Sequence, residues 1–286
     1  MGVAAVSDRL VQTLVPLEAK SPFELRVDLG RDVPESDVRS ALASGEMGFL
    51  HSFTTGSAVD GPGIRVVAWT TGCMWRCLYC HNPDTWTLTN GIPVTLTRAV
   101  EALRKYRHGL KIMSGGFTLS GGEPLMQDRF AVKLLAAARE MGIHTALDTN
   151  GYLGERLSDQ ELETVSLFLL DIKGWDPERH RRLTGMDISP VLAFARRLAD
   201  RRKAVWVRFV LVPGLTDNFD DIAHIADFAA GLGVVERVDV LPFHQMGRFK
   251  WMELGLSYEL ENTQPPSAEL VARVCSRFQQ AGLAAY

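Results

Sequence analysis

From about residue 64 onward, the chain alternates short apolar runs with amphipathic segments. Six apolar runs are rich in Val, Leu, Ile and Phe and are bounded by Gly, Pro or Asp: Ile64–Thr71, Phe117–Ser120, His144–Asp148, Leu167–Ile172, Val205–Val212 and Arg237–Phe243. Their apolarity is continuous rather than alternating, which is typical of strands covered on both faces, as in a parallel sheet. The pattern therefore predicts six parallel strands.

The segments between these runs repeat their apolar residues with the spacing of an α-helix. Helices are predicted over Gln127–Gly142, Val191–Arg202, Phe219–Leu232 and Ser267–Ala281. Gly142 suits a helix C-cap, and Ser158 with Glu161 has the spacing of a capping box.

Strand–helix alternation at this spacing implies βαβ units with right-handed crossovers. Six such units are too few to close an eight-stranded barrel of the usual kind. The predicted fold class is therefore α/β, a partial (β/α)6 TIM-like barrel with mostly parallel strands. Its functional groups are expected at the C-terminal ends of the strands.

Residues 1–47 follow a different pattern, with short apolar stretches separated by Pro16, Pro22 and Pro34. The stretches are Leu10–Val15, Phe23–Leu29 and Val38–Leu42. We expect a partly ordered N-terminal extension over residues 1–47, with one or two short helices, and a core domain over residues 48–286.

Composition and charge exclude several classes of protein. The formal net charge is −3, from 31 Lys+Arg and 34 Asp+Glu, which gives no footprint for nucleic acid or an anionic membrane. No apolar run approaches the roughly 18 residues that a membrane span needs. The N-terminus lacks the basic region and long apolar core of a secretory signal. We expect a cytoplasmic protein with neither a nucleic-acid nor a membrane partner.

Three of the four cysteines lie in one loop, directly after the first predicted strand. Cys73, Cys77 and Cys80 have C-x3-C-x2-C spacing, and Cys275 is far away in the sequence. Such a loop supplies three thiolates, whereas a [4Fe–4S] cluster normally takes four, so one iron would remain open for chemistry. A structural zinc site with His81 as the fourth ligand is the alternative, but neighbouring residues rarely reach one small ion and a second ligand pair is missing.

Polar residues recur at the ends of the other predicted strands. The second ends in Ser120-Gly121-Gly122-Glu123-Pro124, whose glycines allow a backbone to approach a ligand closely and whose Glu123 could accept from an ammonium group. The other strands end in or contain Asp148, Asp171, Lys173, Arg208 and His244. Each residue alone has a structural explanation, such as a tight turn or a paired core charge. Their recurrence at one edge favours a site, because buried charges are costly unless paired or liganded.

Several motifs in one order resemble the radical S-adenosylmethionine superfamily. The cysteine loop with Tyr79, followed by Gly121-Gly122-Glu123-Pro124, carries the general resemblance. Further runs resemble the glycyl-radical-enzyme activases, and among them the activases of pyruvate formate-lyase, from about His51 to the C-terminus. These runs are Val59–Arg65, Cys80–Trp86, Asp148–Gly151, Val205–Gly214 and Leu241–His244. No cysteine lies between Cys80 and Cys275, which favours the compact type that has no additional clusters.

The resemblance implies roles for individual residues. Cys73, Cys77 and Cys80 would bind the [4Fe–4S] cluster, and Asp60 would contact the substrate peptide. Asp148, Thr149 and Asp171 resemble a site for a monovalent cation. The residues implied in S-adenosylmethionine binding are Tyr79, His81, Asn82, Gly121, Gly122, Glu123, Asp148, Asp171, Ile172, Lys173, Arg208 and His244. Among these, Gly121, Gly122 and Glu123 would hold the methionine ammonium group, and Tyr79 would face the adenine.

The resemblance also implies an activity and partners. The reduced cluster would cleave S-adenosylmethionine to methionine and a 5′-deoxyadenosyl radical, which abstracts a glycine Cα hydrogen from pyruvate formate-lyase. Flavodoxin or another low-potential donor would supply the electron, under low oxygen. No catalytic residue beyond cluster and S-adenosylmethionine is expected. Activation of a different glycyl-radical enzyme and a non-catalytic iron–sulfur or zinc protein remain as alternatives.

Overall fold

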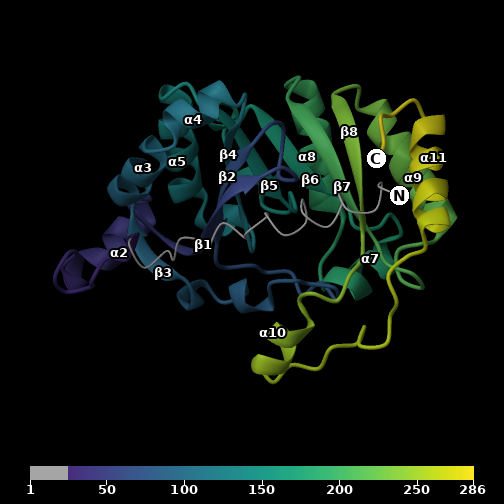
Figure 1. The fold of residues 1–286 in the computed structure, drawn as a ribbon, viewed down its shortest axis with the longest axis horizontal. Coiled ribbons are helices and arrows are strands. Elements are labelled where there is room, and N and C mark those ends of the chain that lie inside the picture. Colours follow the sequence, from purple (N-terminus) through teal and green to yellow (C-terminus); the bar gives the residue numbers. More distant parts are fainter. Residues whose placement is uncertain (1–24) are drawn as a thin grey trace, which may run out of the picture.

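The structure is a computed structural model that describes residues 25–286. Within these residues, eight strands form a single sheet (Figure 1). The predicted stretch Leu10–Val15 and the start of Phe23–Leu29 lie outside these residues. The strands are β1 (Met47–Ser57), β2 (Arg65–Thr70), β3 (Ile92–Thr95), β4 (Gly116–Gly121), β5 (His144–Thr149), β6 (Leu167–Asp171), β7 (Ala204–Leu211) and β8 (Val235–Pro242).

The strand order β3-β1-β2-β4-β5-β6-β7-β8 confirms the predicted α/β fold. Six strands pair in parallel and in chain order, namely β2, β4, β5, β6, β7 and β8. Each of them corresponds to one predicted run. β1 pairs antiparallel with β2 and with β3. Because β3 and β8 are the two ends of the sheet and do not pair, the barrel is partial.

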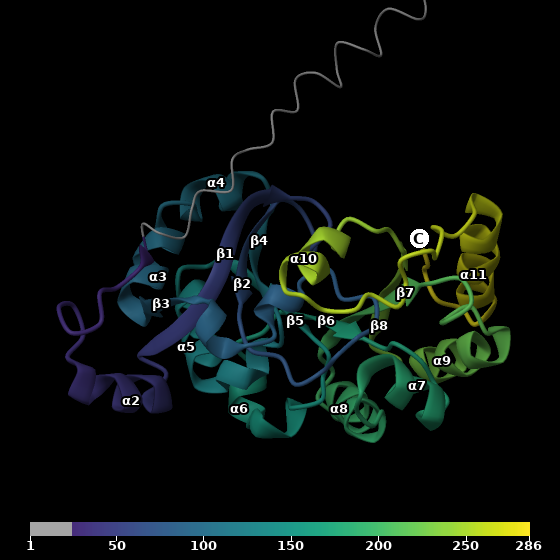
Figure 2. The same ribbon diagram turned by 90° about the horizontal axis from the view of Figure 1, so that it is seen from below.

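Helices connect the parallel strands, and α5, α6, α8 and α9 lie along one side of the sheet in Figure 2. The helices are α2 (Glu35–Ser44), α3 (Leu96–Arg104), α4 (Arg107–Ile112), α5 (Asp128–Glu140), α6 (Asp159–Leu162), α7 (Pro177–Thr184), α8 (Ser189–Asp200), α9 (Phe219–Gly231), α10 (Arg248–Glu253) and α11 (Ala268–Gln280). The capping box of Ser158 and Glu161 is present, and Gly142 follows α5 with φ +72°. Within residues 25–286, every helix is too short or too polar to span a lipid bilayer.

The two faces of the sheet have different environments. Side chains that face the helices, among them Leu119, Leu147 and Leu170, are fully buried in the main hydrophobic core. Ala146, Leu167 and Leu169 form a smaller apolar cluster. Their positions alternate with those of the core side chains, so they belong to the inner face of the barrel. This coverage on both sides explains why the strands read as continuous apolar runs.

Four elements near the site were not predicted: β1, β3, α7 and α10. β1 mixes polar and apolar residues, β3 spans only Ile92–Thr95 and contains Pro93, and α7 is strongly charged. Such segments carry little hydrophobic periodicity, so packing against neighbouring elements decides their conformation. α2 lies in the predicted extension and packs against β1 and α5.

The turn between β1 and β2 offers a test of this packing. Gly63 has φ +67°, and a Cβ there would lie 2.2 Å from the carbonyl oxygen of Ser114. Gly142 has a similar φ, but a Cβ there would meet nothing within 4 Å. We expect Gly142→Ala to lower the free energy of unfolding by about 1–2 kcal/mol through backbone strain alone, and Gly63→Ala to lower it by more, in urea titrations. Equal losses would contradict the close approach.

Candidate active site

The three clustered cysteines line one cavity of about 230 Å³ beyond the C-terminal end of β2. All three are free thiols, as is Cys275, which lies in α11. The loop is held to the segment that follows it, because Gly72 N–H donates to the Thr85 carbonyl at 2.7 Å and Cys73 N–H donates to that of Trp86 at 3.0 Å. The structure therefore brings together the three residues that the spacing predicts as ligands of one centre.

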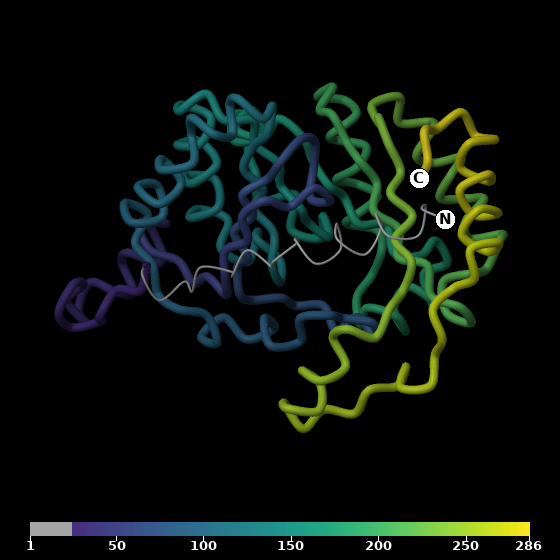
Figure 3. Tube along the Cα trace, in the orientation of Figure 1, coloured from purple at the N-terminus to yellow at the C-terminus, as the bar shows by residue number. Residues whose placement is uncertain are grey.

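Two unpredicted helices hold this loop from outside. Arg76 N–H donates to the carbonyl of Thr184, the last residue of α7, at 2.8 Å. Trp251 of α10 donates from Nε1 to the Cys80 carbonyl at 2.8 Å. Figure 3 shows the segment that carries α10 extending from the end of β8 to lie beside the loop that follows β2. The position of the cysteines thus depends on two helices that lie about 100 residues or more further along the chain.

Burial keeps the cysteine thiols neutral in the protein alone. It raises the pKa of Cys73 to about 12, with the Glu123 carboxylate adding to the shift, and it raises the pKa values of Cys77 and Cys80 as well. Thiols of this kind become thiolates only when positive charge arrives, as it does on metal binding. The nearby Lys173 ammonium lowers all three pKa values in part.

The two glycines after β4 form part of the cavity wall and pack tightly on the cysteine loop. A Cβ on Gly121 would lie 2.2 Å from the backbone of Thr70, and one on Gly122 would lie 2.5 Å from the Gly72 carbonyl oxygen. Glu123 N–H donates to that same carbonyl at 2.8 Å. Both the close approach and the tight turn that the motif suggested are therefore present, with the cysteine loop as the neighbour.

Glu123 is fully buried and does not line the cavity. Its Oε1 accepts from the Leu125 N–H at 3.0 Å and from the Thr149 hydroxyl at 2.7 Å, and its Oε2 accepts from the Asn150 N–H at 2.8 Å. Burial raises the pKa of Glu123 to about 7 although these hydrogen bonds oppose the shift. The carboxylate thus joins the turn after β4 to the turn after β5, and its predicted contact with an ammonium group stays a prediction.

A buried ion pair lies at the end of β6. Lys173 Nζ is 3.0 Å from Asp171 Oδ2 and 5.3 Å from the centre of the Tyr79 ring, and all three residues line the cavity. Burial lowers the pKa of Lys173, but the Asp171 carboxylate together with Tyr79 and Cys77 raises it, and the net pKa lies well above its ordinary value, so the ammonium stays charged. The Tyr79 hydroxyl is buried and has no hydrogen-bond partner among the described residues.

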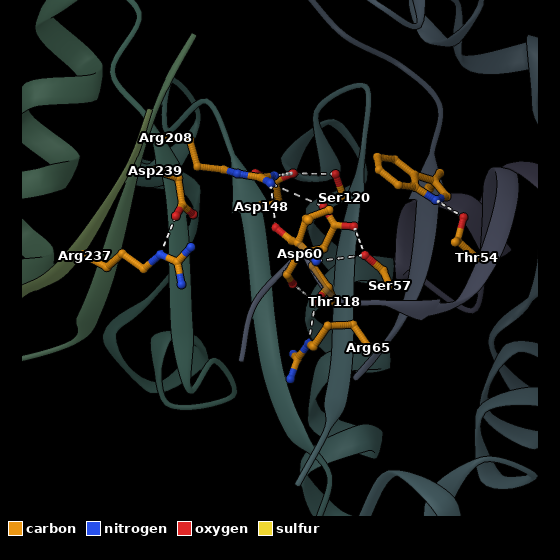
Figure 4. A network of polar contacts seen from close by, with 12 residues as sticks. Thr54, Ser57, Asp60, Arg65, Thr118, Ser120, Asp148, Arg208, Arg237 and Asp239 are labelled. Atoms are coloured by element: carbon orange, nitrogen blue, oxygen red, sulfur yellow. Dashed lines mark hydrogen bonds and ion pairs between the residues drawn. The ribbon is translucent and has the colours of Figure 1, made fainter. Parts of the chain in front are cut away.

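A second network of charges crosses the inside of the barrel (Figure 4). Arg208 Nη1 donates to Asp148 Oδ2 at 3.0 Å, which also accepts from the Ser120 hydroxyl at 2.6 Å. Arg208 Nη2 donates to the Val59 carbonyl at 2.9 Å and lies 3.4 Å from Asp60 Oδ1. Arg208 is thus a paired interior arginine, and Asp148 and Asp60 are its counter-ions.

Two histidines and a lysine fix the segment after Cys80. The His81 and His244 rings stack with centroids 4.2 Å apart, and His81 Nε2 lies 3.0 Å from the His244 carbonyl oxygen. Lys250 of α10 donates to Asn82 Oδ1 at 2.8 Å and lies 3.0 Å from Asp84 Oδ2. These contacts bring the predicted His81, Asn82 and His244 together at one side of the cavity.

The structure places most predicted site residues in the cavity wall and leaves six outside it. Cys73, Cys77, Cys80, Tyr79, His81, Asn82, Gly121, Gly122, Asp148, Asp171 and Lys173 line the cavity. Glu123, Thr149, Arg208, His244 and Asp60 do not, and Ile172 is a fully buried core residue whose N–H donates to the Arg208 carbonyl.

The sequence analysis missed other wall residues, namely Trp69, Trp75, Thr85, Trp86, Ser120, Asn150 and Val210. Trp75 lies inside the cysteine motif, between Cys73 and Cys77, and Trp86 follows the motif. Aromatic residues beside the ligands were the signal that could have identified them.

The predicted cation ligands do not converge through their side chains. Asp148 and Asp171 both line the cavity, but the Thr149 hydroxyl donates to Glu123. Successive residues of a strand point to opposite faces, so Thr149 could join Asp148 only through its backbone. Across residues 25–286, no three His, Cys, Asp or Glu side chains are arranged to hold a single metal ion.

Comparison with known proteins gives consistent matches. The sequence profile of the radical SAM superfamily matches residues 67–229. The pyruvate formate-lyase 1-activating enzyme of Escherichia coli (strain K12) is 39% identical over 238 residues, covering 82% of this chain and 97% of that protein. The pyruvate formate-lyase-activating enzyme of Staphylococcus aureus (strain USA300) is 43% identical over 231 residues, covering 78% of this chain and 92% of that protein.

A solved structure agrees with these matches. The crystal structure of a domain of pyruvate-formate lyase-activating enzyme from Bacteroides vulgatus ATCC 8482 superimposes with a TM-score of 0.51 at 26% identity. The match covers 60% of this chain and 98% of that domain.

The raised pKa of Glu123 predicts a pH dependence of stability. Between the ordinary glutamate value of 4.5 and the folded value of about 7, the folded protein holds a proton that the unfolded chain has released. The stabilisation by this proton is therefore complete below the lower value and is lost as the pH rises through the upper one. It is at most about 3 kcal/mol.

We expect the free energy of unfolding of the metal-free protein, relative to Glu123→Gln, to fall between about pH 5 and about pH 8 in urea titrations. Glu123→Gln serves as the control because glutamine has nearly the shape of glutamate but no group that titrates in this pH range. A constant difference across this range would contradict the assignment.

Proposed function

The chain belongs to the radical SAM superfamily and, within it, to the family of pyruvate formate-lyase-activating enzymes, and from that premise we propose that it activates a pyruvate formate-lyase by removing a hydrogen from the Cα of one of its glycines. One observation carries this proposal. The three free cysteines of the C-x3-C-x2-C loop share a single cavity with Gly121, Gly122 and the Asp171–Lys173 ion pair.

The residues present fit a [4Fe–4S] cluster bound by Cys73, Cys77 and Cys80. Their thiols have raised pKa values and sit beside a lysine, and the remaining cysteine, Cys275, lies away from the loop in α11. A three-cysteine site leaves one iron available to a substrate. A cluster held by Cys73, Cys77 and Cys80 would, once reduced, supply the electron needed to cleave S-adenosylmethionine to methionine and a 5′-deoxyadenosyl radical.

The cavity wall supplies groups for each end of S-adenosylmethionine. Gly121 and Gly122 present backbone at the methionine end, and Asp171 and Lys173 offer a charged pair that can bind ribose hydroxyls or a carboxylate. Tyr79 and His81 provide rings and polar edges for the adenine side, and His244, which lies outside the cavity wall, supports the His81 ring by stacking on it. In this proposal Glu123 does not contact S-adenosylmethionine, and it positions the turns after β4 and β5 through its hydrogen bonds.

Asp148 and Asp171 are the carboxylates that would bind a monovalent cation, with Thr149 contributing its carbonyl oxygen. A cation there would offset negative charge where carboxylates converge.

The peptide of the partner would lie inside the barrel against the Arg208 network. Arg208 Nε is buried and has no hydrogen-bond partner among the described residues, which leaves one donor of the guanidinium unused. Asp60 and Asp148 hold the guanidinium in place from either side. We assign Asp60 to the substrate peptide on this ground.

The remaining parts of the proposal concern the surroundings of the protein. A low-potential protein such as flavodoxin would reduce the cluster, and a cytoplasmic location would keep the three thiols reduced. Trp75 and Trp86 belong to the cavity wall, and Trp86 packs edge-on against Trp251 of α10.

Activity on the partner is tested directly. We expect the anaerobically reconstituted protein, with reductant and S-adenosylmethionine, to produce a glycyl-radical doublet in the electron paramagnetic resonance spectrum of pyruvate formate-lyase. A partner with its radical glycine replaced by alanine is the control and should give none. Formation of 5′-deoxyadenosine without any doublet on the unaltered partner would show that another glycyl-radical enzyme is the target.

The cluster assignment is tested by two cysteine variants. Cys77→Ala should fold but lose most bound iron and sulfide together with the cleavage of S-adenosylmethionine, because two thiolates hold a cluster poorly. Cys275→Ala removes a thiol of α11 and should keep all three properties. Iron and sulfide analysis with circular dichroism gives the comparison. Zinc without sulfide in the unaltered protein would instead support a non-catalytic metal site.

A further inference from the structure

Arg65 is a completely buried arginine at the start of β2 that the function proposed above does not use. Its guanidinium lies beneath residues 58–64, which we call the β1–β2 turn. Nε donates to the Thr118 hydroxyl at 2.9 Å, Nη1 to the Pro62 carbonyl at 3.3 Å, and Nη2 to the Phe117 carbonyl at 2.7 Å. Further contacts reach His144 at the start of β5. One side chain therefore connects the turn with two strands.

The charge of Arg65 has no carboxylate in direct contact within residues 25–286. Burial lowers its pKa to about 10, opposed by the Asp60 carboxylate, so it remains charged at neutral pH. A buried charge is expensive unless its hydrogen bonds are satisfied, and here neutral oxygens of the barrel satisfy them. The main effect of such an arrangement is to hold the accepting oxygens in fixed positions, and its net contribution to the stability of the fold is small.

Thr118 connects Arg65 to Asp60. Its hydroxyl accepts from Arg65 Nε and donates its single hydrogen to the Asp60 carbonyl at 2.6 Å. The Asp60 carboxylate in turn accepts from the Ser57 hydroxyl at 2.6 Å and faces Arg208. Figure 4 shows the continuous row Arg65, Thr118, Asp60 and Arg208 across the barrel interior. The hydroxyl can bridge the two because it is both acceptor and donor.

The glycines around Arg65 leave room for this side chain and for little else. A Cβ on Gly116 would lie 2.0 Å from Arg65 Nη1, and one on Gly61 would lie 3.1 Å from Nε. The guanidinium therefore occupies a space bounded by the turn above it and by β4 beside it. It packs directly against both the β1–β2 turn and β4.

We propose that Arg65 and Thr118 are positioning residues for the substrate peptide, which fix the β1–β2 turn so that the Asp60 carboxylate and the Val59 carbonyl stay on Arg208. The part concerning the peptide rests on the proposed function. The part concerning the turn rests only on the contacts above. Neither residue is assigned to S-adenosylmethionine or the cluster, so their effect should be confined to the peptide.

The test compares Thr118→Val with Thr118→Ser. Valine has nearly the same shape but no hydroxyl, whereas serine keeps the donor and acceptor. In the metal-free protein, we expect amide hydrogen exchange of residues 58–64 to become at least about tenfold faster with valine and to stay near the unaltered rate with serine. Equal exchange in both variants would overturn the proposal. This measurement needs no partner, so it holds or fails independently of the proposed function.

The loaded enzyme gives a second readout. With a glycine-containing peptide of the partner, Thr118→Val should raise KM about tenfold or more while kcat changes by less than about threefold, and serine should restore KM. The change that S-adenosylmethionine causes in the resonance spectrum of the reduced cluster should be the same in all three proteins. Loss of that change in the valine variant, or an unaltered KM, would show a merely structural role.

Arg65→Lys provides a third comparison because it keeps the charge but cannot make the same set of contacts. In Arg65→Lys, the amide hydrogen exchange of residues 58–64 should be faster by about the same factor as in Thr118→Val. If the lysine variant fails to fold, the threonine pair still decides the matter. Exchange of the turn at the unaltered rate in a folded lysine variant would contradict the role of the guanidinium.

Discussion

Parallel pairing in chain order is the constraint on which the site depends. The register sets Thr70 beside Gly121, Thr149 beside Leu170, and Asp171 beside Arg208. Because parallel strands end at the same edge, the cysteine loop, the glycine turn and the Asp171–Lys173 pair all follow strands into one place. A shift of one residue in any strand would turn its polar side chains into the hydrophobic core, so burial of the outer face maintains the register.

Within that frame, charge is arranged in paired groups. Arg208 lies between Asp148 and Asp60, Lys173 pairs with Asp171, and Glu123 receives three hydrogen bonds. In a buried site these pairs have strict geometry, because an unpaired partner would carry the full cost of desolvation. The charged groups of the cavity wall, Asp148, Asp171 and Lys173, are therefore already oriented by their partners.

The cysteine loop has little regular structure of its own and takes its shape from distant segments. Its backbone N–H groups donate to carbonyls of α7 and of the segment ending at Trp86, and Trp251 of α10 donates to its Cys80 carbonyl. At one side of the cavity, Lys250 and the stacked His81 and His244 hold the residues that follow Cys80. The architecture thus combines a barrel held by strand pairing with a loop held by contacts to distant segments.

The sequence by itself determined the elements whose signals are local. Continuous apolar runs identified the six parallel strands, Ser158 and Glu161 the capping box, and the spacing of Cys73, Cys77 and Cys80 the three-thiol centre. Only the tertiary structure decided that Glu123 joins two turns, that Ile172 belongs to the core, and that Arg65 fixes the β1–β2 turn. The physical reason is that periodicity and spacing describe neighbours along the chain. The partners of Glu123 and Arg65 lie on other strands, and their contacts exist only once the register between strands is set.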